Sequence, residues 1–140
     1  MKKELLESCH TVVSYELDSF GHVNNAVFLN YLEKARCDYM TGKGLSFNDF
    51  KKWQRYPVVT KAALHFKYPA FADDKLLIRG WISGYSAATF TLRYEVVNRD
   101  NDKLLLTGET QHVFVSEKNR PTRIPKEFFD KFIKHLAASR

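Results

Sequence analysis

The sequence has few of the features that mark secreted, membrane-spanning or metal-binding proteins. It has only two cysteines, Cys9 and Cys37, and their spacing is unlike that of metal ligands. We expect each of them to be a reduced, buried thiol. No apolar run approaches the length that spans a bilayer. The first eight residues contain two lysines and two glutamates but no apolar segment, so we predict a cytoplasmic protein without a secretory signal.

Acidic residues are also scarce, since 22 Lys and Arg face 16 Asp and Glu. The resulting net charge of +6 favours an anionic partner, either a nucleic acid, a membrane surface or a phosphorylated small molecule. Nucleic-acid binding has only this charge in its favour, because no surface of interleaved aromatic and basic residues is evident. One segment, residues 118–126, concentrates four basic residues without an acid, and its two prolines predict a loop.

What is present indicates a globular protein. The chain of 140 residues is 44% hydrophobic and 14% aromatic, which is enough to bury a core, and we predict a single domain over residues 1–140. A helical pattern runs from Asn24 or Asn25, either of which suits the N-cap, to about Met40. A short strand is expected before it, over His10–Glu16, and a short helix after it, over Ser46–Trp53.

The second half of the chain has the pattern of β-structure. We expect four strands, over residues 58–68, 75–85, 88–98 and 103–116, and then a helix that begins at Pro125. Short breaks between the last three strands favour an antiparallel meander. The predicted fold class is therefore α+β, with a five-stranded antiparallel sheet wrapped around a long central helix, and a C-terminal helix. Such a sheet has edge strands, which proteins often protect by dimerisation.

The segment Asp18-Ser-Phe-Gly-His-Val-Asn-Asn-Ala26 places a carboxylate directly before the helix start. Free N–H groups at a helix N-terminus favour a developing oxyanion, so this pattern suits chemistry on a carbonyl. Asp18 could equally serve only as an Asx-turn residue. An imidazole is the side chain best suited to proton transfer, so His22 could assist, but it could equally hold the loop by hydrogen bonds. Asn25 can orient a water but cannot transfer a proton.

This segment, followed by Tyr31-x-Glu33-x-Ala35-Arg36, resembles the signature of the hotdog-fold acyl-CoA thioesterases, in the 4-hydroxybenzoyl-CoA thioesterase-like family. The resemblance extends over nearly the whole chain. Tyr68-Pro69-Ala70 with Asp74 is similar to the loop after the family's second strand, and Arg120-Pro121-x-x-Ile124-Pro125 is similar to its exit from the last strand. The resemblance implies a hotdog fold, a homodimer or homotetramer, and hydrolysis of an acyl-CoA to free acid and coenzyme A.

The resemblance also assigns roles to individual residues. Asp18 takes the place of the catalytic carboxylate, which attacks the thioester carbonyl or activates water, with His22 or Asn25 assisting. Backbone N–H groups around Val23, Asn24 and Ala26 would polarise the thioester oxygen. Lys118, Arg120 and Arg123 are the candidates for the phosphates of coenzyme A, which is part of the substrate, so no separate cofactor is expected.

Three alternatives stay open from the sequence. In another hotdog branch a helix glutamate is the catalytic acid, which makes Glu33 a second candidate, although an ion pair with Arg36 is the preferred reading. The chain could also be a non-catalytic hotdog that binds acyl-CoA or an acidic acyl carrier protein. A hotdog dehydratase is disfavoured, because the Asp-x-Asn-Pro-x-His context is missing. His65 and His112 lie within expected strands, and nothing marks them as ligands, so we predict no metal site.

Overall fold

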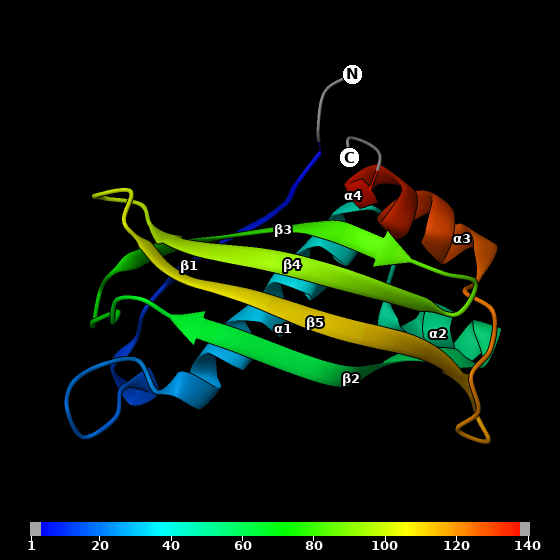
Figure 1. Ribbon diagram of the computed structural model, residues 1–140, viewed down its shortest axis with the longest axis horizontal. Coiled ribbons are helices and arrows are strands. Elements are labelled where there is room, and N and C mark those ends of the chain that lie inside the picture. Colours follow the sequence, from blue (N-terminus) through cyan, green and yellow to red (C-terminus); the bar gives the residue numbers. More distant parts are fainter. Residues whose placement is uncertain (1–3, 138–140) are drawn as a thin grey trace.

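The computed structural model describes residues 4–137, which fold around one five-stranded antiparallel sheet (Figure 1). Its strand order is β1-β3-β4-β5-β2, so β3, β4 and β5 form the expected meander and β2 lies beside β5. The strands are β1 (Leu6–Thr11), β2 (Arg55–Phe66), β3 (Lys75–Tyr85), β4 (Thr89–Asn98) and β5 (Leu104–Ser116).

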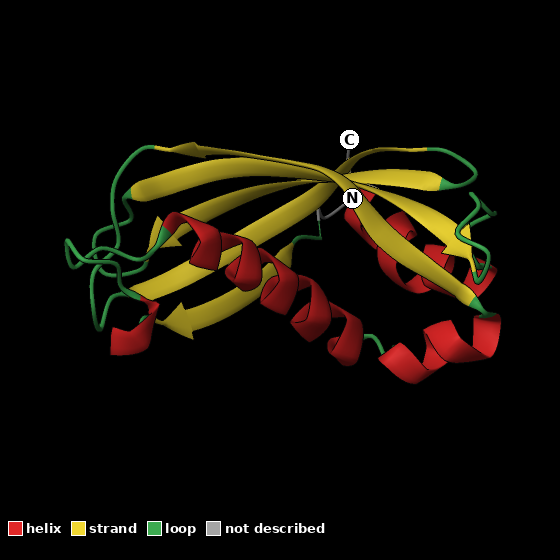
Figure 2. Cartoon of the chain, turned by 90° about the horizontal axis from the view of Figure 1, so that it is seen from below, coloured by secondary structure: helices red, strands yellow, loops and turns green. Residues whose placement is uncertain are grey.

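All of the longer helices lie on one side of this curved sheet (Figure 2). The central helix α1 (Asn25–Gly42) has 18 residues and buries Phe28, Leu32 and Ala35, which recur at the helical spacing seen in the sequence. It is followed by α2 (Phe47–Trp53), which covers one end of the sheet. The α+β arrangement that the sequence predicts, a sheet wrapped on a central helix, is confirmed.

The C-terminal helical segment packs on the same side through a cluster of aromatic rings. It consists of α3 (Lys126–Phe128), the π-helical turn η2 (Phe129–Ile133) and α4 (Lys134–Ala137). Phe128 lies 4.9 Å from Phe114 of β5 and 4.8 Å from Phe132, measured between ring centroids. Burial of these rings ties the end of the chain to the sheet and to α2, and each such ring contributes roughly 2–3 kcal/mol.

The first strand is displaced from its predicted position. It covers Leu6–Thr11 instead of His10–Glu16, and a 3₁₀ turn η1 (Ser14–Glu16) takes up the rest. The apolar residues there indicated a strand, but the amide of Val13 donates to the Glu16 carboxylate at 3.0 Å, which folds the chain back on itself. The expectation of buried thiols is also wrong, since Cys9 is exposed on an edge strand and Cys37 is only half-buried.

The edge strand β2 is exposed on both faces along most of its 12 residues. The side chain of Val59 is 49% exposed, and Lys61 is the one charged residue between Tyr56 and Leu64. A long apolar edge of this kind is a template for pairing with another strand. None of the helices within residues 4–137 is long and apolar enough to cross a membrane.

Candidate active site

The loop that carries Asp18 is held by its own carboxylate. Oδ1 of Asp18 accepts hydrogen bonds from the backbone N–H of Phe20 at 2.9 Å and of His22 at 3.2 Å. Gly21 adopts φ = +82°, a conformation that glycine reaches without strain. The Asx-turn interpretation is therefore right for one oxygen of Asp18. The other oxygen, Oδ2, has no hydrogen-bond partner among the described residues and remains available for chemistry.

The start of α1 leaves one backbone donor free. Asn24 is the N-cap, and its side chain accepts from the N–H of Ala26 at 2.9 Å. The N–H of Val23 donates to the carbonyl of Ala70, and that of Asn24 donates to the carbonyl of Glu16. Within residues 4–137, the N–H of Asn25 has no acceptor. The three N–H groups that the sequence suggested for an oxyanion, those of Val23, Asn24 and Ala26, are therefore all used, and that prediction is wrong. In the same turn the free donor is the N–H of Asn25, which the sequence suggested only for its side chain.

Asp18 and Asn25 line the same hollow, which has a volume of about 210 Å³. One wall comes from the end of β2 and the segment after it, and the other from the loop and the first turn of α1. The ring of His22 also borders the hollow and meets Phe71 edge-on at 5.1 Å. The lining residues are Asp18, His22, Val23, Asn25, Phe28, Phe66, Lys67, Tyr68 and Pro69.

Glu16 locks this loop onto α1. Its carboxylate accepts from the hydroxyl of Tyr31 at 2.8 Å and lies 3.0 Å from Nε2 of His10, in addition to the Val13 amide. Burial opposes ionisation of Glu16, but hydrogen bonds from Val13, His10 and Tyr31 outweigh it and lower the pKa. Burial and the neighbouring carboxylate raise the pKa of Tyr31. The loop therefore presents Asp18 from a rigid base.

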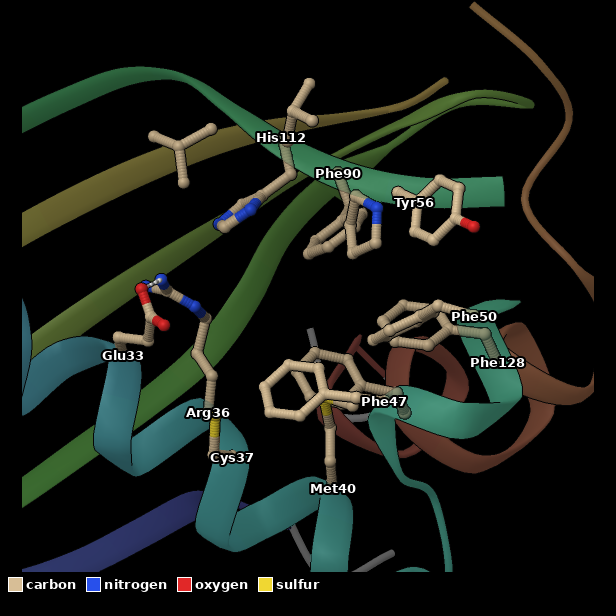
Figure 3. Close-up of a pocket in the computed structure, with 14 residues that line it drawn as sticks. Glu33, Arg36, Cys37, Met40, Phe47, Phe50, Tyr56, Phe90, His112 and Phe128 are labelled. Carbon is tan, nitrogen blue, oxygen red and sulfur yellow. Dashed lines mark ion pairs between the residues drawn. The ribbon is translucent and has the colours of Figure 1, made fainter. Parts of the chain in front are cut away.

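A second and larger cavity lies at the other end of the sheet, between the C-terminal half of α1, α2, β2 and the C-terminal helices (Figure 3). Its volume is about 410 Å³, within the usual range for small-molecule sites. Most of the lining is apolar, and the exceptions are Glu33, Arg36 and His112. The complete lining is Glu33, Arg36, Cys37, Met40, Phe47, Phe50, Tyr56, Pro57, Val58, Val59, Phe90, His112, Phe128 and Phe132.

The polar wall of this cavity is formed by Arg36 and His112, which are joined by a chain of hydrogen bonds through two side chains behind the wall. Arg36 donates through Nη1 to the hydroxyl of Tyr94 at 3.0 Å. That hydroxyl lies 2.6 Å from Oγ1 of Thr110, which lies 2.8 Å from Nε2 of His112. Burial, together with the nearby charge of Arg36, lowers the pKa of His112 to about 3. The imidazole is consequently neutral at physiological pH.

Comparison with known proteins identifies the fold and the family. Residues 12–132 match the model of the thioesterase-like superfamily. The chain belongs to this superfamily. It is 30% identical to the chloroplastic acyl-acyl carrier protein thioesterase ATL3 of Arabidopsis thaliana over 89% of this chain and 66% of that protein. It is 37% identical to the long-chain acyl-CoA thioesterase FadM of Escherichia coli over 48% of this chain and 50% of that protein. The chain thus spans just under two thirds of the plant relative.

The solved structures agree with this family. The 1,4-dihydroxy-2-naphthoyl-CoA thioesterase Slr0204 from Synechocystis superposes with a TM-score of 0.84, covering 89% of this chain and 93% of that one at 22% identity. At that identity the likeness shows the fold alone. The hotdog fold that the sequence motifs implied is confirmed.

The structure separates two groups of residues that the sequence had placed in one site. Lys118, Arg120 and Arg123 are exposed or near the surface in the loop after β5, next to the start of β2, where Nη1 of Arg55 donates to the carbonyl of Arg123. The loop that precedes α1 lies near the other end of β2 (Figure 1), where Asp18 and Phe66 line the same hollow. The two groups are roughly 30 Å apart along the strand. Within one protomer they do not form a single site.

Two further outcomes concern α1 and metals. Glu33 is 67% exposed and lies 3.7 Å from Nη2 of Arg36, so the expected ion pair is present. Sequence reasoning missed the buried group of Tyr94, Thr110 and His112, because nothing in the local pattern distinguishes these residues from other strand residues. Across residues 4–137, no group of three or more His, Cys, Asp or Glu side chains could hold a metal ion.

Proposed function

We propose that this protein hydrolyses acyl thioesters, with Asp18 as the general base or nucleophile. The observation that carries the proposal is the pairing, in one hollow, of a carboxylate oxygen without a partner and a free backbone N–H at a helix start. The N–H of Asn25 would hold the thioester oxygen as negative charge develops there, where the positive end of the helix dipole adds to the stabilisation. The side chains of His22 and Asn25 border the same space and would position water.

The exposed edge of β2 supports assembly into a homodimer, which could in turn form a homotetramer. Antiparallel pairing of β2 with its own copy over the full strand would bring Phe66 opposite the partner subunit's Arg55. The hollow with Asp18 would then face the large cavity and the basic loop of the other protomer. This arrangement reunites the catalytic carboxylate with an acyl cavity and with cationic side chains.

The basic loop suits the phosphates of the thiol carrier. Lys118, Arg120 and Arg123 lie without an acidic residue among them, and the arginine fork matches phosphate geometry. Coenzyme A carries such phosphates, and an acyl carrier protein presents a phosphopantetheine on an acidic surface. The similarity to an acyl-acyl carrier protein thioesterase and to an acyl-CoA thioesterase supports testing both donors.

Thiol release from a panel of acyl-CoAs and acyl-acyl carrier proteins tests this proposal. We expect measurable turnover by the unmodified protein and about a thousandfold lower kcat for Asp18→Asn, because the amide cannot act as base or nucleophile. Asn retains an oxygen for the hydrogen bonds of the turn, so the fold is preserved. Asp100→Asn, in the exposed turn after β4, is the matched control.

Two outcomes would overturn the assignment. Unchanged turnover by Asp18→Asn would remove Asp18 from the chemistry. Tight binding of acyl-CoA or acyl carrier protein without hydrolysis of any thioester would replace the enzyme with the alternative function, a non-catalytic acyl-binding hotdog.

A further inference from the structure

The polar wall of the large cavity has a fixed direction of hydrogen bonding. Arg36 can only donate, so the hydroxyl of Tyr94 must accept from it. The proton of that hydroxyl is satisfied only if it is given to Oγ1 of Thr110, its other neighbour. Thr110 must then give its own proton to Nε2 of His112. The reverse order would leave the buried Tyr94 proton without an acceptor. Such a loss lowers the equilibrium constant for folding on the order of tenfold or more.

This direction determines which ring nitrogen of His112 carries the proton. Because Nε2 accepts and the ring is neutral, Nδ1 must hold the N–H. The side chain is almost wholly buried, with the residue only 3% exposed, and stacks on Phe90 at 4.6 Å. In the part of the chain that the structure describes, no acceptor meets Nδ1. Nδ1 therefore carries an N–H that has no protein partner within residues 4–137, and the cavity is the space into which it can donate.

Arg36, on the opposite wall of the cavity, also has N–H donors that lack an acceptor among the described residues. Its side chain is 14% exposed, and its contacts are one hydrogen bond to Tyr94 and a 3.7 Å ion pair with the exposed Glu33. A guanidinium has five N–H groups, so several of its donors are not used by these two contacts. Figure 3 shows Arg36 rising from α1 and His112 descending from the sheet toward the same part of the cavity.

We propose that this cavity binds an acyl group that carries an acceptor oxygen in its chain, with a keto oxygen held between Nδ1–H of His112 and the guanidinium of Arg36. Aromatic and aliphatic side chains around the two donors would enclose the hydrocarbon on either side of that oxygen. An unsubstituted chain would offer no acceptor to the Nδ1–H of His112 or to the unused N–H groups of Arg36, and sites built to bind an oxygen discriminate strongly against ligands that lack it. The inference rests on the proposed function, because the ligand is the acyl group of the thioester.

Binding measurements test this without relying on hydrolysis. The Asp18→Asn protein is titrated by calorimetry with decanoyl-CoA and with isomers of oxodecanoyl-CoA that carry the keto group at successive positions, and with matching hydroxy isomers. We expect one keto isomer to bind about tenfold more tightly than decanoyl-CoA, the usual effect of a hydrogen bond to a charged donor. Equal affinity for the hydroxy isomer with oxygen at the same position would show that the site binds an acceptor oxygen of either kind.

A matched pair of variants and an NMR measurement distinguish loss of the keto preference from a general loss of folding. Arg36→Met keeps a long side chain without donors and should bring the keto preference close to one, whereas Arg93→Met, at an exposed ion pair with Glu109, should preserve it. Nitrogen-15 NMR of His112 should show the proton on Nδ1 and a shift of that signal when the preferred isomer binds.

The outcomes separate this inference from the proposed function. Equal affinity for all isomers, or a proton on Nε2 of His112, overturns the inference even if thioesters are hydrolysed. A clear keto preference in a protein that hydrolyses no thioester upholds the inference as a binding site and overturns the catalytic proposal alone.

Discussion

The hollow around Asp18 and the large cavity lie at opposite ends of β2 and are built in opposite ways. The hollow is small and has a mixed lining of polar and apolar side chains, and its reactive groups come from one continuous stretch, Asp18 to Asn25. The cavity is larger and mostly apolar, and its charged and imidazole groups come from α1 and β5. Chemistry that needs a carboxylate next to a helix start can be supplied locally, whereas a pocket that distinguishes acyl groups requires several elements.

Mixed dimers test most directly whether the hollow of one protomer works with the cavity of the other. Asp18→Asn removes the base, and Cys37→Trp fills the cavity from its half-buried wall position. We expect each variant alone to lose roughly a thousandfold in turnover of a long-chain thioester. If β2 pairs with its own copy as proposed, a dimer of one of each should recover activity, because the intact Asp18 of one protomer would face the intact cavity of the other.

Differently tagged protomers allow the mixed dimer to be purified and assayed. Pairing Asp18→Asn with the double variant Asp18→Asn/Cys37→Trp contains no intact site and provides the baseline. Activity of the mixed dimer at this baseline would show that each carboxylate works with the cavity of its own chain.

Because His112 is neutral when buried, we expect the free energy of unfolding to fall at acid pH. Its pKa of about 3 in the folded state lies below the value of 6.5 in the unfolded chain, so the unfolded state binds the proton first as the pH falls. Stability is therefore highest above pH 6.5 and declines between pH 6.5 and 3, by roughly 3–5 kcal/mol. Urea unfolding across this window should show a shallower decline for His112→Gln, which retains an acceptor for Thr110. Equal slopes would contradict the buried neutral state.

Two glutamates provide the smallest test, on stability alone. Glu16 is 11% exposed in its side chain and satisfies three donors, whereas Glu33 is 67% exposed and has one long ion pair. Glu16→Ala should lower the free energy of unfolding by about 2–3 kcal/mol, because buried donors lose their acceptor. Glu33→Ala should lower it by less than about 0.5 kcal/mol. Similar losses, measured by thermal unfolding at pH 7, would mean that Glu16 does not lock the Asp18 loop.

How far the sequence could predict each site follows from this difference. Asp18, Asn24 and the start of α1 are neighbours in the chain, so spacing alone was enough to predict a carboxylate beside a helix cap. The alternation of apolar residues likewise predicted β3, β4 and β5 to within about a residue. The first strand was misplaced because Val12 and Val13 have strand propensity, whereas the fold-back to Glu16 is decided by a hydrogen bond that propensity does not contain.

The cavity could not be predicted in the same way. In the register of β4 and β5, Leu92 lies opposite Thr110. Tyr94 is two residues further along β4 on the same face, so it reaches Thr110 diagonally, and Arg36 reaches Tyr94 from α1. These contacts exist only once the sheet and the helix are assembled. The sequence assigned Asp18 and the basic loop to one substrate but left open which subunit supplies the loop. Order along the chain does not show that β2 separates the two groups within one protomer.

The pairing of β2 with β5 also has a consequence for biosynthesis. Ser116, the partner of Arg55, leaves the ribosome several seconds after it at ordinary rates of translation. During that interval β2 lacks β5, its neighbour in the sheet, and its backbone can pair with another strand that is nearby. Nascent chains on one polysome would be the first such strands, so the same edge that suits a dimer is open to premature pairing during synthesis.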